Sequence, residues 1–192
     1  MTTQDTSAPS PTLQEVSTKP KVEQLEAWTD GATAVRNPGL AGAACVLKLN
    51  DNDFRAMAQH LGHTTNNVAE LSAISLLLGW FLKNPEHQHP LLVIYSDSEY
   101  AIGVCSGQKR ASANKELVYG IQAMIKQLES SGMKIGFAWV QAHAKDELNN
   151  TADLLAKYAS YNITCNTSLN GVKAFNREEF LDMKQRLLQE KK

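Results

Sequence analysis

The 192 residues of the chain are 43% hydrophobic and 20% charged, which is typical of one globular domain with tails. The formal net charge of −1 excludes an argument for nucleic-acid binding from bulk charge, so a nucleic-acid surface must be local. Three widely spaced cysteines fit neither a disulfide framework nor a zinc site, and no apolar run reaches membrane-spanning length, so we expect a cytoplasmic protein without a membrane contact.

The N-terminal part of the sequence predicts a tail followed by three strands. Residues 1–22 are rich in Ser, Thr and Pro and lack hydrophobic periodicity, which is typical of a disordered segment. Apolar, strand-like stretches follow at 25–30, 42–49 and 54–61. Turn-forming residues lie between these stretches, so the three strands are expected to form an antiparallel meander.

The remainder of the sequence alternates predicted helices and strands. Residues 66–84 are long, apolar and helix-favouring, and Asn66 or Asn67 is the expected N-cap. The later elements are a strand at 91–96, a short helix from about 98, a helix at 114–131, a strand at 134–140 and helices at 149–160 and 176–189. This order predicts an α/β fold, with a mixed sheet flanked by helices on both faces.

Four carboxylates fall where predicted strands end or predicted helices begin. Asp30 ends the first strand, Asp97 follows the fourth strand, and Glu70 and Asp153 lie in early turns of two helices. Ligands of open α/β sheets collect near the carboxyl ends of strands, so the four side chains could meet there. Taken singly, each acid also suits an ordinary role in a turn, at a helix terminus or on a solvated helix face.

The stretches around the four acids are more specific than the acids alone. They read "TDGATAVRNPGLAG" around Asp30, "TTNNVAELSAI" around Glu70, "IYSDSEYA" around Asp97 and "WVQAHAKDELNNTADLLA" around Asp153. His143 stands ten positions before the last of these acids. In this order and spacing, the four stretches resemble the type 1 ribonuclease H family over roughly residues 25–160.

The resemblance implies a fold and an activity. The implied RNase H-like fold has a five-stranded mixed sheet, with its first three strands antiparallel, in a catalytic domain at 23–161. Residues 162–192 would then be a linker and an amphipathic C-terminal helix, which either packs on the domain or contacts a protein partner or the hybrid. The implied activity is endonucleolytic cleavage of the RNA strand of an RNA–DNA hybrid, leaving 5′-phosphate and 3′-hydroxyl ends, and we expect a monomer.

The resemblance also implies a metal centre. Asp30, Glu70, Asp97 and Asp153 would hold two Mg²⁺ ions, for which Mn²⁺ is a possible substitute. Hard cations prefer carboxylate oxygens, and two ions about 4 Å apart can clamp the attacking and leaving oxygens of an in-line displacement. His143 matches the mobile histidine of the family, which assists proton transfer or product release.

A further set of residues matches positions that contact substrate in the family, through backbone groups around Gly31 to Asn37 and through polar side chains elsewhere. An enzyme that tells RNA from DNA must sense 2′-hydroxyls across a wide minor groove, and side chains that both donate and accept hydrogen bonds suit this. Turn or helix-cap roles compete at each position, and Asn149 in particular can cap its helix. The candidate substrate-binding residues are Gly31, Asn37, Thr65, Asn66, Asn67, Glu99 and Asn149.

One segment departs from the family pattern, and the roles of the tryptophans and of the whole chain leave alternatives open. The segment "SGQKRASANK" at 106–115 is only modestly basic where bacterial members often carry a Lys- and Trp-rich protrusion. Trp28, Trp80 and Trp139 are expected to pack inside or against the sheet rather than stack on bases. The alternative functions are a non-catalytic nucleic-acid-binding or scaffold module on the same fold, or the RNase H domain of a reverse transcriptase or polyprotein.

Overall fold

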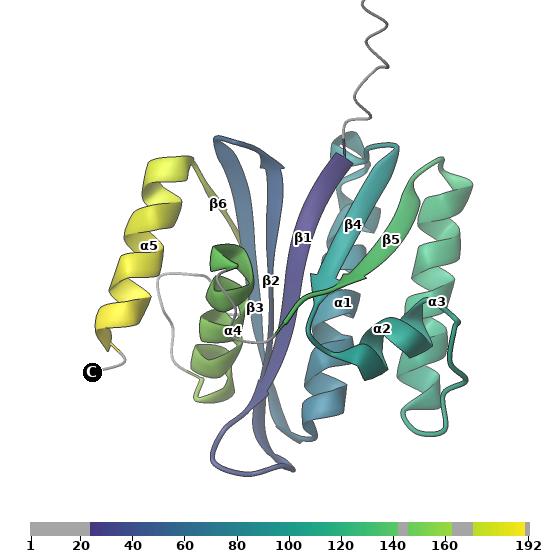
Figure 1. Cartoon of the computed structure of the whole chain (residues 1–192), viewed down its shortest axis with the longest axis horizontal. Helices are drawn as coiled ribbons and strands as arrows, with labels where there is room; N and C mark the ends of the chain where they lie inside the picture. Colours follow the sequence, from purple (N-terminus) through teal and green to yellow (C-terminus); the bar gives the residue numbers. More distant parts are fainter. Residues whose placement is uncertain (1–23, 142–145, 163–170, 191–192) are drawn as a thin grey trace, which may run out of the picture.

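The computed structural model describes residues 24–141, 146–162 and 171–190, whose centre is a six-stranded mixed sheet (Figure 1). Its strands are β1 (Gln24–Thr33), β2 (Gly39–Asn50), β3 (Asp53–Thr64), β4 (Leu91–Ser96), β5 (Lys134–Trp139) and β6 (Gly171–Phe175). In space they follow the order β5-β4-β1-β2-β3-β6. The pairs β1–β4 and β4–β5 are parallel and the other three are antiparallel, so the predicted meander of β1 to β3 is confirmed.

The helices lie on both faces of the sheet, as predicted (Figure 1). They are α1 (Asn66–Lys83), α2 (Glu99–Cys105), α3 (Lys115–Ser130), α4 (Glu147–Ser160) and α5 (Arg177–Glu190), with a short 3₁₀ helix, η1 (Pro85–His87). No helix within the described ranges is long and apolar enough to cross a membrane. The predicted disordered tail at 1–22 and the candidate His143 lie outside the described residues.

The prediction of five strands was wrong by one strand at the C-terminal side. Within the predicted linker, β6 pairs antiparallel with β3 in the register Met57↔Val172. A five-residue edge strand has little pattern of its own, because its partner strand supplies the backbone hydrogen bonds that define it. The predicted C-terminal helix is α5, and Phe180 on this helix stacks on Phe54 of β3 with ring centroids 4.7 Å apart.

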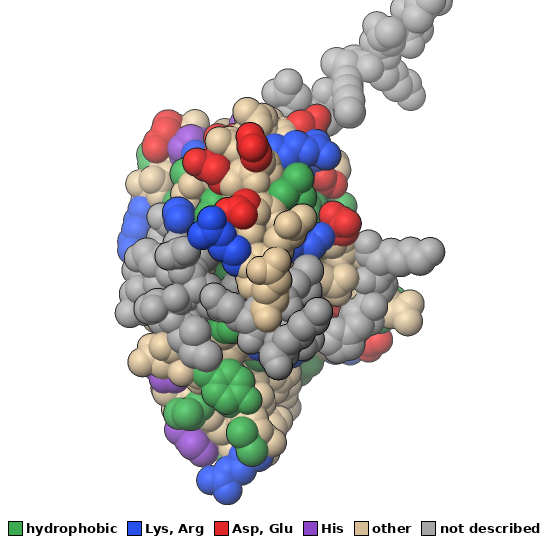
Figure 2. All heavy atoms as spheres, turned by 90° about the vertical axis from the view of Figure 1, so that its left-hand side faces the viewer, with side chains coloured by type: hydrophobic (Ala, Val, Ile, Leu, Met, Phe, Trp, Pro, Cys, Tyr) green, Lys and Arg blue, Asp and Glu red, His purple; other side chains and the backbone are tan. Residues whose placement is uncertain are grey.

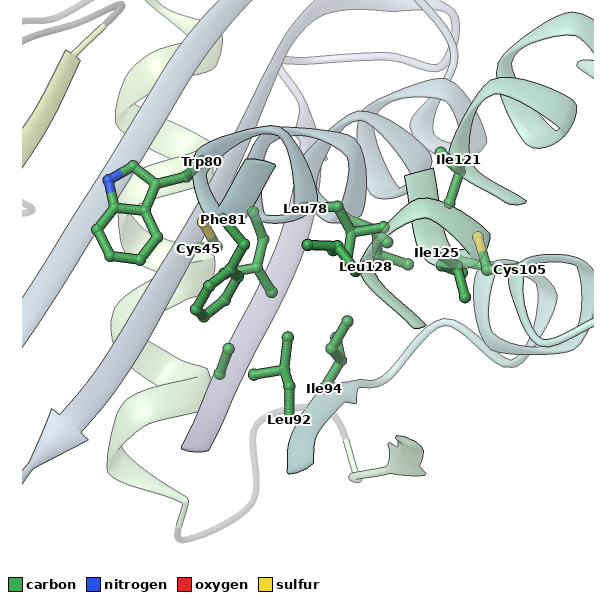
Figure 3. Close-up of a cluster of buried hydrophobic side chains, with 14 of the residues drawn as sticks. Cys45, Leu78, Trp80, Phe81, Leu92, Ile94, Cys105, Ile121, Ile125 and Leu128 are labelled. Atoms are coloured by element: carbon green, nitrogen blue, oxygen red, sulfur yellow. The ribbon is translucent and has the colours of Figure 1, made fainter. Parts of the chain in front are cut away.

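One face of the sheet is covered by α1, α2 and α3 and holds the larger apolar cluster (Figure 3). Side chains alternate along a strand, so Leu92 and Ile94 of β4 both point into this cluster. Phe81 of α1 and Leu128 of α3 meet them there, and all four side chains are fully buried. Removing each of these side chains from water stabilises the fold by roughly 1.5–3 kcal/mol.

The other face carries α4 and, at the β6 side, α5 (Figure 1). Gly42 of β2 lets α4 approach closely, because a Cβ there would lie 2.3 Å from the Ala156 carbonyl oxygen. Figure 2 shows the α5 side of the molecule, on which acidic and basic side chains are interspersed. Lys184 of α5 pairs with Glu147 of α4 at 3.1 Å, so an ion pair joins the two helices on this face.

Two of the three tryptophans are buried as predicted, and the third is not. Trp28 and Trp80 are nearly inaccessible, whereas Trp139 is 55% exposed. Trp139 is the last residue of β5, which is the edge strand at the α3 side of the sheet. Only one neighbouring strand is available to cover a side chain at such an edge, so the prediction from residue type alone failed.

Candidate active site

Gly31 brings β1 into direct contact with the backbone of α1. A Cβ at this position would lie 2.2 Å from the backbone nitrogen of Glu70, so a larger residue would force the strand and helix apart. The Gly31 N–H donates a 3.1 Å hydrogen bond to Oε2 of Glu70. Asp30, the neighbour of Gly31, is therefore held beside Glu70, and each of the two acids is only 5% exposed.

The parallel pairing of β1 and β4 adds Asp97 to the same place. Trp28 is in register with Tyr95, and Asp30 and Asp97 each follow this pair by two residues. The indole Nε1 of Trp139 donates a 3.1 Å hydrogen bond to the Asp97 carbonyl oxygen and fixes the backbone there. As a result, Asp30, Glu70 and Asp97 each offer a carboxylate oxygen, and these oxygens lie within 4.8 Å of one another.

Asp153 lies near this cluster without being one of its three members. It is carried by α4, and its carboxylate makes a 2.7 Å ion pair with Lys157, one turn later on the same helix. The charge of Asp153 raises the pKa of Asp30 and that of Lys157 lowers it, so both groups act on the cluster electrostatically. The structure thus brings three predicted acids together and places the fourth beside them, paired with a cation.

The carboxylates are held where their charges are unfavourable. Burial is the main cause that raises the pKa of Asp30 well above its ordinary value, and the charges of Asp97 and Asp153 add to it. The pKa of Glu70 is also raised well above its ordinary value, first by burial and then by the charges of Asp30 and Asp97. Converging carboxylate oxygens with this mutual repulsion fit a hard divalent cation, which would neutralise them.

The candidate substrate residues near α1 form a connected group at its N-terminus. Thr65 is the N-cap, because its Oγ1 accepts a hydrogen bond from the Val68 N–H at 3.3 Å; the prediction of Asn66 or Asn67 as the cap was wrong. The Asn66 N–H donates to Oδ1 of Asn37 at 2.9 Å, which ties the β1–β2 hairpin to α1. The Asn66 side chain donates to Glu70 at 3.4 Å, so this group adjoins the acids.

The remaining candidates divide into exposed and buried positions. Asn67 and Glu99 are exposed in the first turns of α1 and α2. Asn149 is 2% exposed in the first turn of α4, and its Oδ1 accepts no hydrogen bond from any described residue. Asn149 is not the helix cap, because the Asp146 side chain accepts hydrogen bonds from the backbone N–H groups of Leu148 and Asn149.

Two charged residues at this site, Asp146 and Lys157, were not predicted from the sequence. Asp146 directly precedes a helical pattern that begins with Glu147, which is a typical N-cap signal. Lys157 stands four residues after Asp153, which is the spacing of neighbours on a helix surface. Both signals are present in the sequence, but only the folded structure shows how Asp146 and Lys157 are connected to the clustered acids.

The fold and these motifs agree with the proteins that the chain resembles. The family described as RNase H matches residues 22–161. Ribonuclease HI of Streptomyces coelicolor is 35% identical over 154 residues, which cover 72% of this chain and 62% of that protein. Ribonuclease H of Anaplasma marginale is 31% identical over 139 residues, which cover 68% of this chain and 86% of that protein.

A solved structure shares the fold. LC11-RNase H1 in complex with an RNA/DNA hybrid aligns with a TM-score of 0.58 at 23% identity, over 72% of this chain and 97% of that chain. The chain therefore spans nearly the whole of that structure but less than two thirds of the Streptomyces relative. The matched residues 22–161 include all four acids and the sheet from β1 to β5. On these grounds, the chain belongs to the RNase H family.

Proposed function

We propose that this protein is a metal-dependent endoribonuclease that hydrolyses the RNA strand of RNA–DNA hybrids. The observation that carries the proposal is the convergence of Asp30, Glu70 and Asp97 within 4.8 Å, beside Asp153. Buried carboxylates that raise one another's pKa have no structural advantage, since apolar residues would pack there without electrostatic repulsion. Membership of the RNase H family and the hybrid bound by LC11-RNase H1 support the choice of substrate.

The residues of this chain divide the chemistry among them. Asp30, Glu70, Asp97 and Asp153 would hold two Mg²⁺ ions, or Mn²⁺ in their place. When bound, such ions make the attacking water more acidic and neutralise charge on the departing 3′ oxygen. Hydrogen bonds from Gly31 and Asn66 keep the Glu70 carboxylate in one orientation, and we assign proton transfer to His143 on its motif alone.

Recognition of the RNA strand would use the N-terminus of α1 and the hairpin beside it. Asn37 and Asn66 are joined by a hydrogen bond, so they present polar groups in a fixed arrangement next to Glu70. Amide side chains both donate and accept hydrogen bonds, as 2′-hydroxyls do. Thr65 is the N-cap of α1, and Asn67 and Glu99 lie in the first turns of α1 and α2; these three residues are proposed to contact the backbones of the hybrid.

The proposal is tested by incubating the protein with labelled RNA–DNA hybrid, duplex RNA and duplex DNA, each with and without Mg²⁺. The expected result is cleavage of the RNA strand of the hybrid alone, only with metal, giving 5′-phosphate and 3′-hydroxyl ends. Binding of the hybrid without cleavage at any metal concentration would contradict the proposal and support a non-catalytic module. Cleavage of duplex DNA at the same rate would contradict the proposed substrate.

A further inference from the structure

Asp146 uses its two carboxylate oxygens to hold two separate parts of the molecule. Oδ1 accepts hydrogen bonds from the backbone N–H groups of Leu148 at 3.0 Å and Asn149 at 3.1 Å, which caps α4. Oδ2 accepts a 2.8 Å hydrogen bond from Nε1 of Trp28, a residue 118 positions away in the sequence. Asp146 therefore joins the first turn of α4 to β1.

Through Trp28, this hydrogen bond connects Asp146 to β1 and β4, the strands that lead to Asp30 and Asp97. It is buried on β1, two residues before Asp30, and its ring stacks on Tyr95 with centroids 5.0 Å apart and planes 15° apart. Tyr95 lies on β4, two residues before Asp97, and its hydroxyl donates to Glu26 at 3.2 Å. The two strands and their rings thus form one platform, to which Asp146 attaches the helix.

Apolar packing alone does not determine where α4 lies along its own axis. The helix rests on the sheet through Ala152, Leu155, Ala156 and Ala159, whose side chains are small or aliphatic. Hydrophobic contact is not directional, whereas a hydrogen bond fixes both distance and angle. At the other end of α4, a ring nitrogen of His60 on β3 lies 2.8 Å from the Ala159 carbonyl oxygen, whereas the bond between Asp146 and Trp28 ties the start of the helix to the sheet. Asp153 follows Asp146 by about two helical turns, so a displacement of the first turn would displace Asp153 as well.

We propose that Asp146 is a positioning residue, which acts through Trp28 to set the distance between Asp153 and the carboxylates of Asp30 and Asp97. The inference rests on the proposed function of this site. A helix cap needs a single acceptor oxygen, and asparagine caps helices as well as aspartate does. The bond to Trp28 is an additional interaction, which capping does not require.

Two substitutions remove the hydrogen bond between Trp28 and Asp146, one by changing the acceptor and the other by changing the donor. Asp146→Asn keeps an oxygen to cap α4 but presents an amide group instead of the oxygen that accepts from Trp28. Trp28→Phe keeps a buried ring against Tyr95 but removes the N–H donor. Trp80→Phe is the matched control, because Trp80 is also buried but belongs to the apolar cluster on the opposite face.

We expect each of the two variants to bind Mg²⁺ about tenfold more weakly by calorimetry, as is usual when a partner that orients metal ligands is lost. In hybrid cleavage, kcat should fall by a similar factor while KM stays within twofold. The double variant Trp28→Phe/Asp146→Asn should lose no more than either single variant, because all three lack the same bond. Trp80→Phe should lower the melting temperature without changing Mg²⁺ affinity or kcat.

Wild-type Mg²⁺ affinity in folded Trp28→Phe would overturn the inference, and this variant decides the matter if Asp146→Asn does not fold. Losses that add in the double variant would also overturn it, since they would show two independent effects. The Mg²⁺ titration separates this inference from the proposed function. A wild-type protein that binds Mg²⁺ but cleaves no hybrid would contradict the function, and the affinities of the variants would still test the positioning role.

Discussion

β1 and β4 each run from a buried apolar region to a region of buried acids, and burial stabilises the first region but opposes the charges of the second. In their first halves, Leu25 and Leu92 are buried in the apolar cluster under α1, where removal from water stabilises the fold. At their carboxyl ends, burial opposes the charge of Asp30 and raises its pKa, and the same holds for Glu70 above them. Stability and the proposed chemistry therefore depend on different parts of the same strands, and neutralisation of the acids, by protons or by a bound cation, would remove their mutual repulsion.

Asp97→Asn should have the largest effect, and this effect should be on catalysis and not on stability. We expect kcat for hybrid cleavage to fall by about 10³-fold, because losing a metal ligand removes several kcal/mol of transition-state stabilisation. In EDTA the variant should melt no lower than wild type, since one of the charges that repel Asp30 and Glu70 is gone. Single-turnover cleavage and calorimetric melting measure the two effects, and turnover at the wild-type rate would refute a metal role for Asp97.

Leu92→Ala should have the complementary effect, on stability alone. Leu92 is fully buried, so we expect the free energy of unfolding to fall by about 3 kcal/mol. Mg²⁺ affinity of the folded protein should be unchanged, because the substitution leaves the carboxyl end of β4 intact. Urea denaturation and a Mg²⁺ titration check both statements. If Leu92→Ala weakened Mg²⁺ binding as much as Asp97→Asn does, the claim that the apolar and acidic parts of β4 act independently would be wrong.

The stability of the metal-free wild-type protein should depend on pH through Asp30 and Glu70. Because the pKa values of Asp30 and Glu70 are raised on folding, the folded state binds more protons than the unfolded state above the ordinary carboxyl range. The metal-free protein should therefore lose stability as the pH rises from about 4 through the raised pKa values. Calorimetric melting in EDTA measures this slope, which Glu70→Gln should reduce. The prediction would be contradicted if the stability of the wild-type protein rose with pH across this window while that of Glu70→Gln did not.

Lys157→Gln should have the smallest effect. The Lys157 side chain in the pair with Asp153 is 41% exposed, and such a pair contributes about 0.2–1 kcal/mol, so the metal-free protein should be destabilised by that amount at most. Mg²⁺ should bind more tightly, because no ammonium group competes for the Asp153 carboxylate. Lys184→Gln is the control, since Lys184 of α5 pairs with Glu147, which lies on α4 as Asp153 does. A rise in Mg²⁺ affinity in both variants alike would show a general charge effect instead.

The strands and helices of the RNase H-like core could be predicted because local patterns determine them. Residues 66–84 and 91–96 were predicted as a helix and a strand, and α1 and β4 occupy nearly the same positions. β6 could not be predicted, because its place depends on pairing with β3 rather than on its own five residues. The exposure of Trp139 depends likewise on its place in an edge strand, which its residue type does not reveal.

The site shows the same limit at the level of single side chains. The acids could be predicted from their flanking motifs, and the structure brings Asp30, Glu70 and Asp97 together. The bond between Trp28 and Asp146 could not be predicted, since it joins residues 118 positions apart through a geometry that only the packed fold creates. The pairing of Asp153 with Lys157 was readable as helix spacing, but its effect on Asp30 was not.

The most direct test of the central claim is an anomalous-scattering map from crystals grown with Mn²⁺ in place of Mg²⁺. The claim is that carboxylates distant in the sequence jointly bind divalent cations at the carboxyl ends of β1 and β4. The account predicts a strong peak coordinated by Asp30, Glu70 and Asp97, and a second peak beside Asp153 when substrate is bound. A map without a peak at these side chains at millimolar metal, or with its strongest peak elsewhere, would contradict it.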